Sequence, residues 1–339
     1  MFIKKQLILI LFISSFVQAQ NTSSVRNLIF EGAGIRGVAY SGAIRELEKR
    51  NILQTVQRVG GTSAGAVIAL TLSLGYAADE ITTLIGNTSF KKFNDRKFFF
   101  IGGINRLNKY YGWYRGQQFE KWLSKLIEAK THNADITFGE LHQQGFKDLY
   151  VTGTCLNRQS LVIFSHENYP GMKVKDAIRI SSSIPLYFEA VFIDRSGKAV
   201  HHPKNRNSLD LMADGGFIAN FPIKLFDSTK YFDTTLPNEF AINPQTIGFR
   251  IDREEQIIND TKGRGLAPMD INNLNSYLGA LYNMVMENLN RQTLTREDWQ
   301  RTISISDESI APRIRKLQQE EVQLLIQNGS SAVAQYFFR

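Results

Sequence analysis

Two glycine-framed segments near the start of the chain carry residues that could perform acyl transfer. The segment Gly61-Thr62-Ser63-Ala64-Gly65 has the pattern G-x-S-x-G, which places a serine on a sharp strand-to-helix turn that only small neighbours allow. The pattern predicts Ser63 as a nucleophile on an elbow formed with Gly61 and Gly65. The segment Gly32-Ala33-Gly34-Ile35-Arg36-Gly37 lets backbone N–H groups converge on an anion at a helix N-terminus, and it predicts an anion cradle.

The anion cradle is compatible with two ligand classes. Binding a dinucleotide requires an acidic residue at the end of the next strand, about 20 residues on, to hold a ribose hydroxyl. That strand is predicted over residues 55–59 and continues into Gly60 and Gly61 without a carboxylate, while Glu46 and Glu48 lie on the intervening helix. A nucleotide-binding oxidoreductase is therefore the weakest candidate, and an oxyanion intermediate suits the cradle equally well.

A serine nucleophile needs a base, and the histidines are badly placed to supply it. The chain has five histidines, and none follows His202, whereas the α/β-hydrolase layout places its histidine late, after the nucleophile and the acid. A carboxylate is the remaining candidate. Asp214, in Ala213-Asp214-Gly215-Gly216, follows an apolar strand and is presented at its end, although Asp-Gly-Gly alone is equally compatible with a plain turn.

These motifs carry a resemblance to a known family. The glycine-rich motif with its basic residue, the G-x-S-x-G pattern and the Asp-Gly-Gly motif occur here in the order found in patatin-like phospholipases. A fourth block, residues 176–185 ending in Pro185, is similar to the helix of that family that ends in small residues and proline. The resemblance covers about residues 25–225. Ala33 departs from it, because many members have glycine there, and its methyl group requires a negative φ.

The resemblance implies a Ser–Asp dyad on a three-layer α/β/α fold with a central, mostly parallel sheet. Ser63 would attack an ester carbonyl while Asp214 takes its proton, and water activated by the same aspartate would hydrolyse the acyl-enzyme. The implied oxyanion hole lies in the motif that contains Gly32, Ala33, Gly34, Arg36 and Gly37, and the implied support comes from Gly215, Gly216 and Pro185. Arg36 either supports this loop or attracts a phosphate head group. The chemistry requires no metal or organic cofactor.

The implied activity is a phospholipase A type of acyl ester hydrolase. A general carboxylesterase or neutral-lipid lipase on the same fold is the alternative, because the residues that shape the substrate pocket cannot be recognised in the sequence. A catalytically silent lipid-binding protein would keep the fold but would not need both Ser63 and Asp214. Lipid head group, position of cleavage and oligomeric state are not predicted.

The hydrophobic pattern predicts the elements that position these motifs. A strand over 27–30, a helix to residue 50, the strand over 55–59 and a helix over 64–74 are typical of an α/β sheet. Further strands are predicted over 149–154, 161–164, 209–213, 246–251 and 302–305, and helices over 119–130, 174–183, 269–300 and 313–327, the last capped by Asn328-Gly329. We expect one catalytic domain over 20–339, with a helical extension over about 260–339.

The composition is that of a globular protein, and the N-terminal residues predict that it is exported. Among 339 residues, 43% are hydrophobic and 21% are charged. Cys155 is the single cysteine, which excludes internal disulfides and multi-cysteine metal sites, and we expect it to be buried. Residues 1–19 read as a signal peptide, with Lys4 and Lys5 before an apolar run and Ala19 at the cleavage site. The product would be periplasmic, outer-membrane-associated or extracellular.

The net charge of +8 indicates an anionic lipid surface more than nucleic acid, because the basic residues are dispersed and no nucleic-acid-binding module occurs. The basic aromatic segment Lys91–Phe100 is a candidate for peripheral membrane contact. Alternatively, its aromatic side chains fill the core beneath the segment. His201 and His202 are adjacent in a polar stretch, which favours an exposed loop over a metal site.

Overall fold

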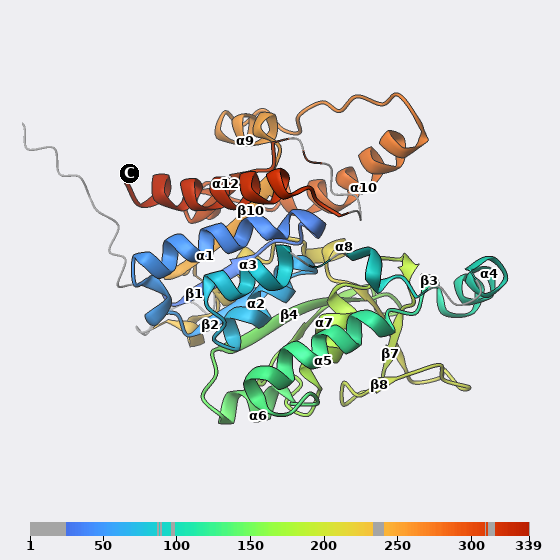
Figure 1. The fold of residues 1–339 in the computed structure, drawn as a ribbon. Helices are drawn as coiled ribbons and strands as arrows, with labels where there is room; N and C mark the ends of the chain where they lie inside the picture. Colours follow the sequence, from blue (N-terminus) through green and yellow to red (C-terminus); the bar gives the residue numbers. More distant parts are fainter. Residues whose placement is uncertain are drawn as a thin grey trace, which may run out of the picture.

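The computed structural model describes residues 25–86, 88, 90–95, 99–232, 241–308, 310 and 316–338. The predicted signal peptide and residues 96–98 of the basic aromatic segment lie outside the described residues. None of the helices within these ranges has the length and hydropathy of a bilayer-spanning helix. Figure 1 shows the path of the chain, with the last helix lying beside the first one.

A single large sheet organises the molecule. Its parallel half has the order β11-β10-β1-β2-β4, and these strands are Thr302–Ser306, Thr246–Asp252, Asn27–Phe30, Arg58–Gly61 and Asp148–Cys155. Beyond β4 the pairing becomes antiparallel, through β9 (Asp210–Asp214), β7 (Val191–Ile193) and β8 (Ala199–Val200). β5 (Ser160–Phe164) pairs with β4 as an antiparallel hairpin. The predicted parallel centre is confirmed.

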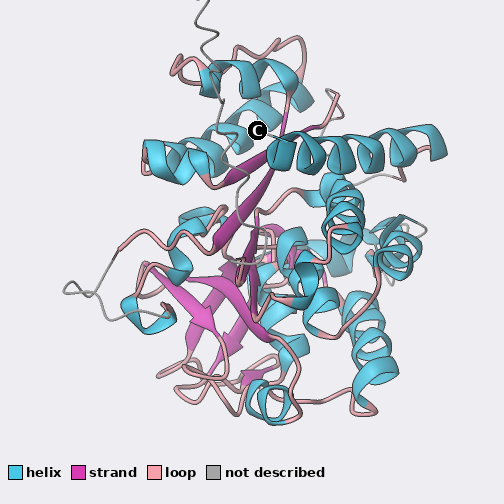
Figure 2. Ribbon diagram, turned by 90° about the vertical axis from the view of Figure 1, so that its left-hand side faces the viewer, coloured by secondary structure: helices cyan, strands magenta, loops and turns pink. Residues whose placement is uncertain are grey.

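Helices and loops cover both faces of this sheet. Successive strand residues point to opposite faces, and so Leu28 and Phe30 of β1 belong to one apolar cluster while Ile29 belongs to another. The helices that contribute side chains to the larger cluster include α1 (Ala39–Lys49), α2 (Ala64–Ser73), α5 (Gln117–Thr131), α7 (Val174–Ser181) and α12 (Gln319–Phe338). The smaller cluster packs β1 and β4 against residues 221–231. The molecule therefore has three layers, with the strands running through its middle in Figure 2.

The C-terminal third of the chain belongs to this sheet as well as to the helical layer. β11 forms the outermost parallel strand, and α12 packs along α1. The predicted cap at Asn328-Gly329 is wrong, because α12 continues to Phe338. Gly329 instead permits close helix packing, since a Cβ there would collide with the carbonyl oxygen of Ala39. The long helix predicted over 269–300 is two helices, α10 (Leu274–Arg291) and α11 (Arg296–Gln300), and Thr295 caps the second one.

The remaining elements form a small second sheet and further helices. Residues 90–114 contain a 3-10 helix, η4 (Phe90–Phe93), then α4 (Phe99–Tyr110) and β3 (Gly112–Tyr114). β3 pairs with β6 (Leu186–Phe188) in a small second sheet. α4 extends from the right-hand side of Figure 1. The other helices are α3 (Ala78–Gly86), α6 (Phe138–Gln143), α8 (Gly216–Ala219) and α9 (Glu254–Thr261). Cys155 is fully buried and free, as predicted.

Candidate active site

Ser63 lies on the turn between β2 and α2, as the pattern predicts. Its backbone has φ 52° and ψ −119°, a left-handed conformation that is strained for a residue with a side chain. The N–H of Ser63 donates to the Ser181 hydroxyl at 2.9 Å, which ties the elbow to the end of α7. The strain is therefore held in place by a contact from a distant part of the chain.

Gly61 and Gly65 are required by the close approach of three backbone segments. A Cβ at Gly61 would lie 2.5 Å from the carbonyl carbon of Gly65, and one at Gly65 would collide with the carbonyl oxygen of Phe30. Without these side chains, α2 begins directly against the ends of β1 and β2. The N-terminus of α2, which favours negative charge, is thus brought next to Ser63.

Asp214 ends β9, where the strand pairs antiparallel with Gly153 of β4. Its N–H donates to the Ser183 carbonyl at 3.0 Å. Its Oδ1 accepts the N–H of Gly216 at 2.8 Å. Its Oδ2 is buried and accepts no hydrogen bond from the described residues. Oδ1 thus holds the carboxyl in place, while Oδ2 is left available to accept a proton.

Burial raises the pKa of Asp214 to about 7, even though the N–H of Gly216 and the Ser63 hydroxyl both lower it. The Ser63 hydroxyl therefore lies close enough to act on the carboxyl, without completing a hydrogen bond to Oδ2. Catalytic hydrogen bonds are often this loose before substrate binds. The structure brings together the serine and the aspartate that the sequence motifs single out, and it gives the aspartate the proton affinity of a base at neutral pH.

The glycine-rich loop faces the same site with part of its backbone. Gly32 is not a free donor, because its N–H donates to the Asn220 carbonyl at 3.0 Å. Among the described residues, no acceptor engages the N–H of Ala33 or Gly34. Ala33 has φ −132°, so its methyl group is accommodated without strain, and Gly34 has the positive φ of 56°. The available donors of the predicted oxyanion loop are thus Ala33 and Gly34.

Arg36 points away from the pocket and supports the loop. The side chain is buried, its Nη1 pairs with the Asp307 carboxylate at 2.5 Å, and its Nε donates to the Ala33 carbonyl at 3.3 Å. Of the two roles predicted for Arg36, the geometry matches loop support. Gly37 allows the loop to approach α2, because a Cβ there would lie 3.2 Å from that of Ala64.

Asn220 is a site residue that the sequence motifs did not single out. Its Nδ2 donates to the Gly32 carbonyl at 3.0 Å and to Glu31 Oε1 at 3.3 Å. Its carbonyl accepts the N–H of Gly32, so that Asn220 holds this part of the loop through both backbone and side chain. The only signal available was its position six residues after Asp214, at the end of the turn that begins with Gly215.

An apolar pocket opens at Ser63. Its free volume is about 70 Å³, and apart from Ser63 and Ser182 it is lined by glycine, aliphatic and aromatic residues: Gly34, Ile35, Ala64, Val67, Phe93, Phe119, Ile184, Tyr187 and Phe188. Among the described residues, no charged side chain lines it. Pockets of this composition bind apolar groups, with the few polar groups fixing their orientation. A hydrocarbon chain attached to the group that Ser63 attacks would fit this lining.

The position of Phe93 bears on the two alternatives predicted for the basic aromatic segment Lys91–Phe100, membrane contact and filling of the core. The ring is buried against Phe119 and Trp122, with centroid distances of 5.1 Å and 5.6 Å. This aromatic side chain therefore fills the core, as the alternative prediction proposed, and it reaches the apolar pocket. The Lys92 side chain is exposed. The side chains of Lys91 and of residues 96–100 lie outside the described residues.

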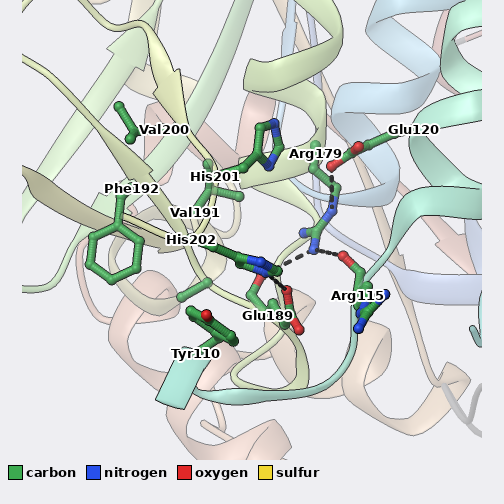
Figure 3. Close-up of a pocket in the computed structure, with 11 residues that line it drawn as sticks. Tyr110, Arg115, Glu120, Arg179, Glu189, Val191, Phe192, Val200, His201 and His202 are labelled. Carbon is green, nitrogen blue, oxygen red and sulfur yellow. Dashed lines mark hydrogen bonds and ion pairs between the residues drawn. The ribbon is translucent and has the colours of Figure 1, made fainter. Parts of the chain in front are cut away.

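A second pocket, shown in Figure 3, is lined by charged side chains and contains the buried guanidinium of Arg179. Arg179 donates to the carbonyls of Arg115 and Glu189 at 2.9 Å and 3.0 Å, and to the Ser183 hydroxyl at 2.5 Å. Because the carbonyl of Ser183 accepts the N–H of Asp214, this network fixes the backbone behind the aspartate. Arg179 is therefore a positioning residue for the strand end.

The histidines lie away from Ser63. His201 and His202 are exposed in a loop, as predicted, and His202 Nε2 lies 2.9 Å from Glu189 Oε2. His142, Asp148 and His166 form a cluster whose ligand atoms lie within 4.8 Å of one another. The two imidazole rings are stacked at 4.0 Å and are parallel to within 2°. Since imidazole binds metals through a lone pair in the plane of its ring, these two rings as oriented do not converge on one ion.

A serine on a strand-to-helix elbow is an arrangement that occurs in hydrolases with an α/β fold. A model of the patatin-like phospholipase family matches residues 28–227. The match spans more than half of the chain and includes the motifs of Ser63 and Asp214. The chain therefore belongs to this family.

The comparisons with individual proteins found similar sequences and a similar fold. The chain is 31% identical over 212 residues to the uncharacterized protein YqhO of Bacillus subtilis, a match that covers 60% of this chain and 67% of that one. It is 26% identical over 201 residues to the probable lipid hydrolase 463L of invertebrate iridescent virus 6, covering 59% and 62%. The chain thus spans about two thirds of the length of these relatives. The solved structure of VipD from Legionella pneumophila shares the fold, with a TM-score of 0.55 at 15% identity over 93% of this chain and 67% of that one.

Proposed function

We propose that this chain hydrolyses the fatty-acyl esters of phospholipids in the manner of a phospholipase A, through a dyad of Ser63 and Asp214. The observation that carries the proposal is the buried Asp214 carboxyl, whose pKa is about 7, placed beside an elbow serine at an apolar pocket. Membership of the patatin-like phospholipase family and the likeness to a probable lipid hydrolase support it.

Acylation begins when Ser63 Oγ attacks the ester carbonyl carbon. Asp214 Oδ2 takes the hydroxyl proton, and the carbonyl oxygen becomes an oxyanion that accepts the N–H groups of Ala33 and Gly34. Donors aimed at a developing oxyanion lower the barrier by about 3–4 kcal/mol each. The tetrahedral intermediate collapses as the lysophospholipid oxygen leaves and takes the proton from Asp214. Ser63 now carries the fatty acyl group.

Deacylation repeats these steps with water. A water molecule gives a proton to Asp214 and attacks the acyl carbon, and the same N–H groups stabilise the second oxyanion. The fatty acid is released as Ser63 Oγ regains the proton from Asp214. Every proton passes through the Asp214 carboxyl. Because the pKa of this carboxyl is near neutrality, it can both accept a proton and return it.

A general carboxylesterase or neutral-lipid lipase is the second candidate. The specific observation in its favour is the lining of the pocket, where the described residues include no charged side chain that could select a phosphate head group. Arg36, the nearest cation in the sequence motif, is paired with Asp307 instead. The substrate class therefore depends on contacts outside the pocket.

The decisive experiment measures fatty-acid release from mixed phospholipids and from neutral esters. We expect wild-type activity on phospholipid, with at least a thousandfold loss of kcat in Ser63→Ala and Asp214→Asn. A matched control is the exposed pair Ser196 and Asp194, which are joined by a 2.6 Å hydrogen bond, changed to Ser196→Ala and Asp194→Asn. Activity that survives both dyad substitutions would refute the mechanism. Cleavage of neutral esters alone would favour the second candidate.

We also propose that the chain is exported and that its first 19 residues are removed. The proposal rests on the charged start, apolar run and small residues before Gln20. N-terminal sequencing of the protein secreted or translocated by an expressing cell should begin at Gln20. An intact Met1 on the exported protein would contradict it.

A further inference from the structure

Helix α10 exposes a continuous apolar stripe next to the proposed active site. Large hydrophobic side chains are normally covered, and contiguous exposed ones mark an interaction surface. Among the α10 side chains that the structure describes, six of them have exposed fractions between 43% and 69%. They are Leu274, Tyr277, Leu278, Leu281, Met284 and Val285.

The spacing places these six residues on one face of the helix. At 100° per residue they cover an arc of about 120°, as wide as the face that a surface helix usually buries in its own core. Met286 points to the other side, where it is buried. α10 is therefore fixed to the protein by one face and presents the apolar stripe outward.

The inward contact of α10 is with the catalytic turn. α10 packs against α8, directly after Asp214 and Gly215, and a Cβ at Gly216 would collide with the methyl group of Met286. Figure 1 shows α10 above α8. Ile218 of α8 is exposed as well. The helix that carries the apolar stripe thus contacts, through its other face, the turn that follows Asp214.

The charge pattern and the area of the stripe indicate what covers it. Residues 271–286 contain no Asp, Glu, Lys or Arg, so neither a charged protein surface nor a nucleic acid would find a complementary partner here. Six half-exposed side chains of this size offer about 600 Å². A stable dimer buries about 800 Å² on each partner, and a bilayer needs no matching surface.

We propose that the stripe of α10 inserts into the surface of a lipid bilayer and holds the Ser63 pocket against it. The inference deepens the proposed function, on which it rests, by assigning the surface that recruits the lipid. A helix whose exposed stripe carries no charged side chain binds through apolar insertion instead of attraction to anionic lipids. Binding therefore occurs on zwitterionic vesicles and is insensitive to salt.

The experiment separates vesicle binding from catalysis. Ser63→Ala protein is sedimented with phosphatidylcholine vesicles, without and with about 20% phosphatidylglycerol, at about 0.05 M and 0.5 M salt. The test variant is Leu278→Gln with Leu281→Gln, since glutamine keeps helix propensity. The matched control changes two leucines with similar exposure elsewhere, Leu156→Gln with Leu324→Gln. Thermal unfolding of each variant shows whether it is folded.

We expect the test variant to bind vesicles at least tenfold more weakly, while the control binds within twofold of the parent. In the Ser63 background, the test variant should hydrolyse a soluble short-chain ester at the parental rate and lose activity on vesicles. Vesicle binding that is unchanged by the test substitutions refutes the inference. So does binding that requires anionic lipid and disappears in salt, or a dimer of the parent that the test substitutions disperse. If no ester is hydrolysed but binding responds as expected, only the proposed function fails.

Discussion

Replacing Asp214 by asparagine should remove a dependence of stability on pH. The pKa of the buried carboxyl is raised from 3.8 to about 7, which means that the native state holds this proton more tightly than the unfolded chain does. A raised folded-state pKa contributes stability that is fully present below about pH 4 and is lost as the pH rises through 7. The neutral amide of the asparagine variant would carry no such dependence.

The magnitude follows from the size of the pKa shift. Each unit of pKa difference corresponds to about 1.4 kcal/mol. The free energy of unfolding of Asp214→Asn, relative to that of the wild type, should therefore increase by about 1.4 kcal/mol per pH unit between about pH 4 and 7. The total gain is about 4 kcal/mol. Above about pH 7 the difference should become constant, since the carboxyl is then ionised in both states.

Urea unfolding of both proteins between about pH 4.5 and 8.5 measures this difference. Ser63→Ala provides a matched control, because the Ser63 hydroxyl lowers the pKa of Asp214 and its removal should move the plateau to higher pH. A difference between Asp214→Asn and the wild type that does not change with pH would show that the carboxyl is not held in a desolvated site. The assay involves no substrate, so it tests the electrostatics of the site independently of the proposed reaction.

Three further substitutions test the site and its support. Asn220→Ala removes the side-chain bond to the Gly32 carbonyl and should lower kcat about 10- to 100-fold with little change in KM. A larger change in KM than in kcat would contradict a role in the oxyanion loop. Val67→Phe narrows the apolar pocket and should shift the preferred ester toward shorter acyl chains, measured with a chain-length series. Gly329→Ala forces a methyl group against the Ala39 carbonyl and should destabilise by about 1–3 kcal/mol, whereas Gly279→Ala, which meets no atom within 4 Å, should not destabilise.

Much of the site could be predicted because its chemistry depends on local backbone geometry. Ser63 is identified by the glycines that its elbow needs, and these glycines stand at fixed spacing within five residues. Contacts between residues far apart in the sequence have no comparable local motif. Ser181 accepts the N–H of Ser63 from 118 residues away, and Asn220 holds Gly32 from 188 residues away. Nothing near Gly32 in the sequence indicates that its N–H is engaged.

The errors in the predicted fold have a similar origin. Gly329 after Asn328 is typical of a helix C-terminus, but here the absence of a side chain serves the contact with α1, which only the tertiary structure supplies. The break between α10 and α11 depends on the capping box of Thr295 and Asp298, which competes with a helical hydrophobic pattern on both sides. In each case the local sequence pattern is compatible with two structures, and contacts with other parts of the chain determine which of them forms.

The strength of the proposed base depends on what keeps water away from it. A carboxylate with the usual pKa near 4 is too weak to accept a serine proton at neutral pH, and here burial supplies the difference. Part of the cover is Met286, since the place that a Cβ of Gly216 would occupy lies against both its methyl group and Asp214 Oδ1. The helix that we propose to insert into the bilayer is therefore the one that covers the turn carrying the base. Any displacement of α10 at a membrane would change the hydration of Asp214, and with it the pH at which the carboxyl ionises, so that membrane docking and base strength are coupled through one side chain.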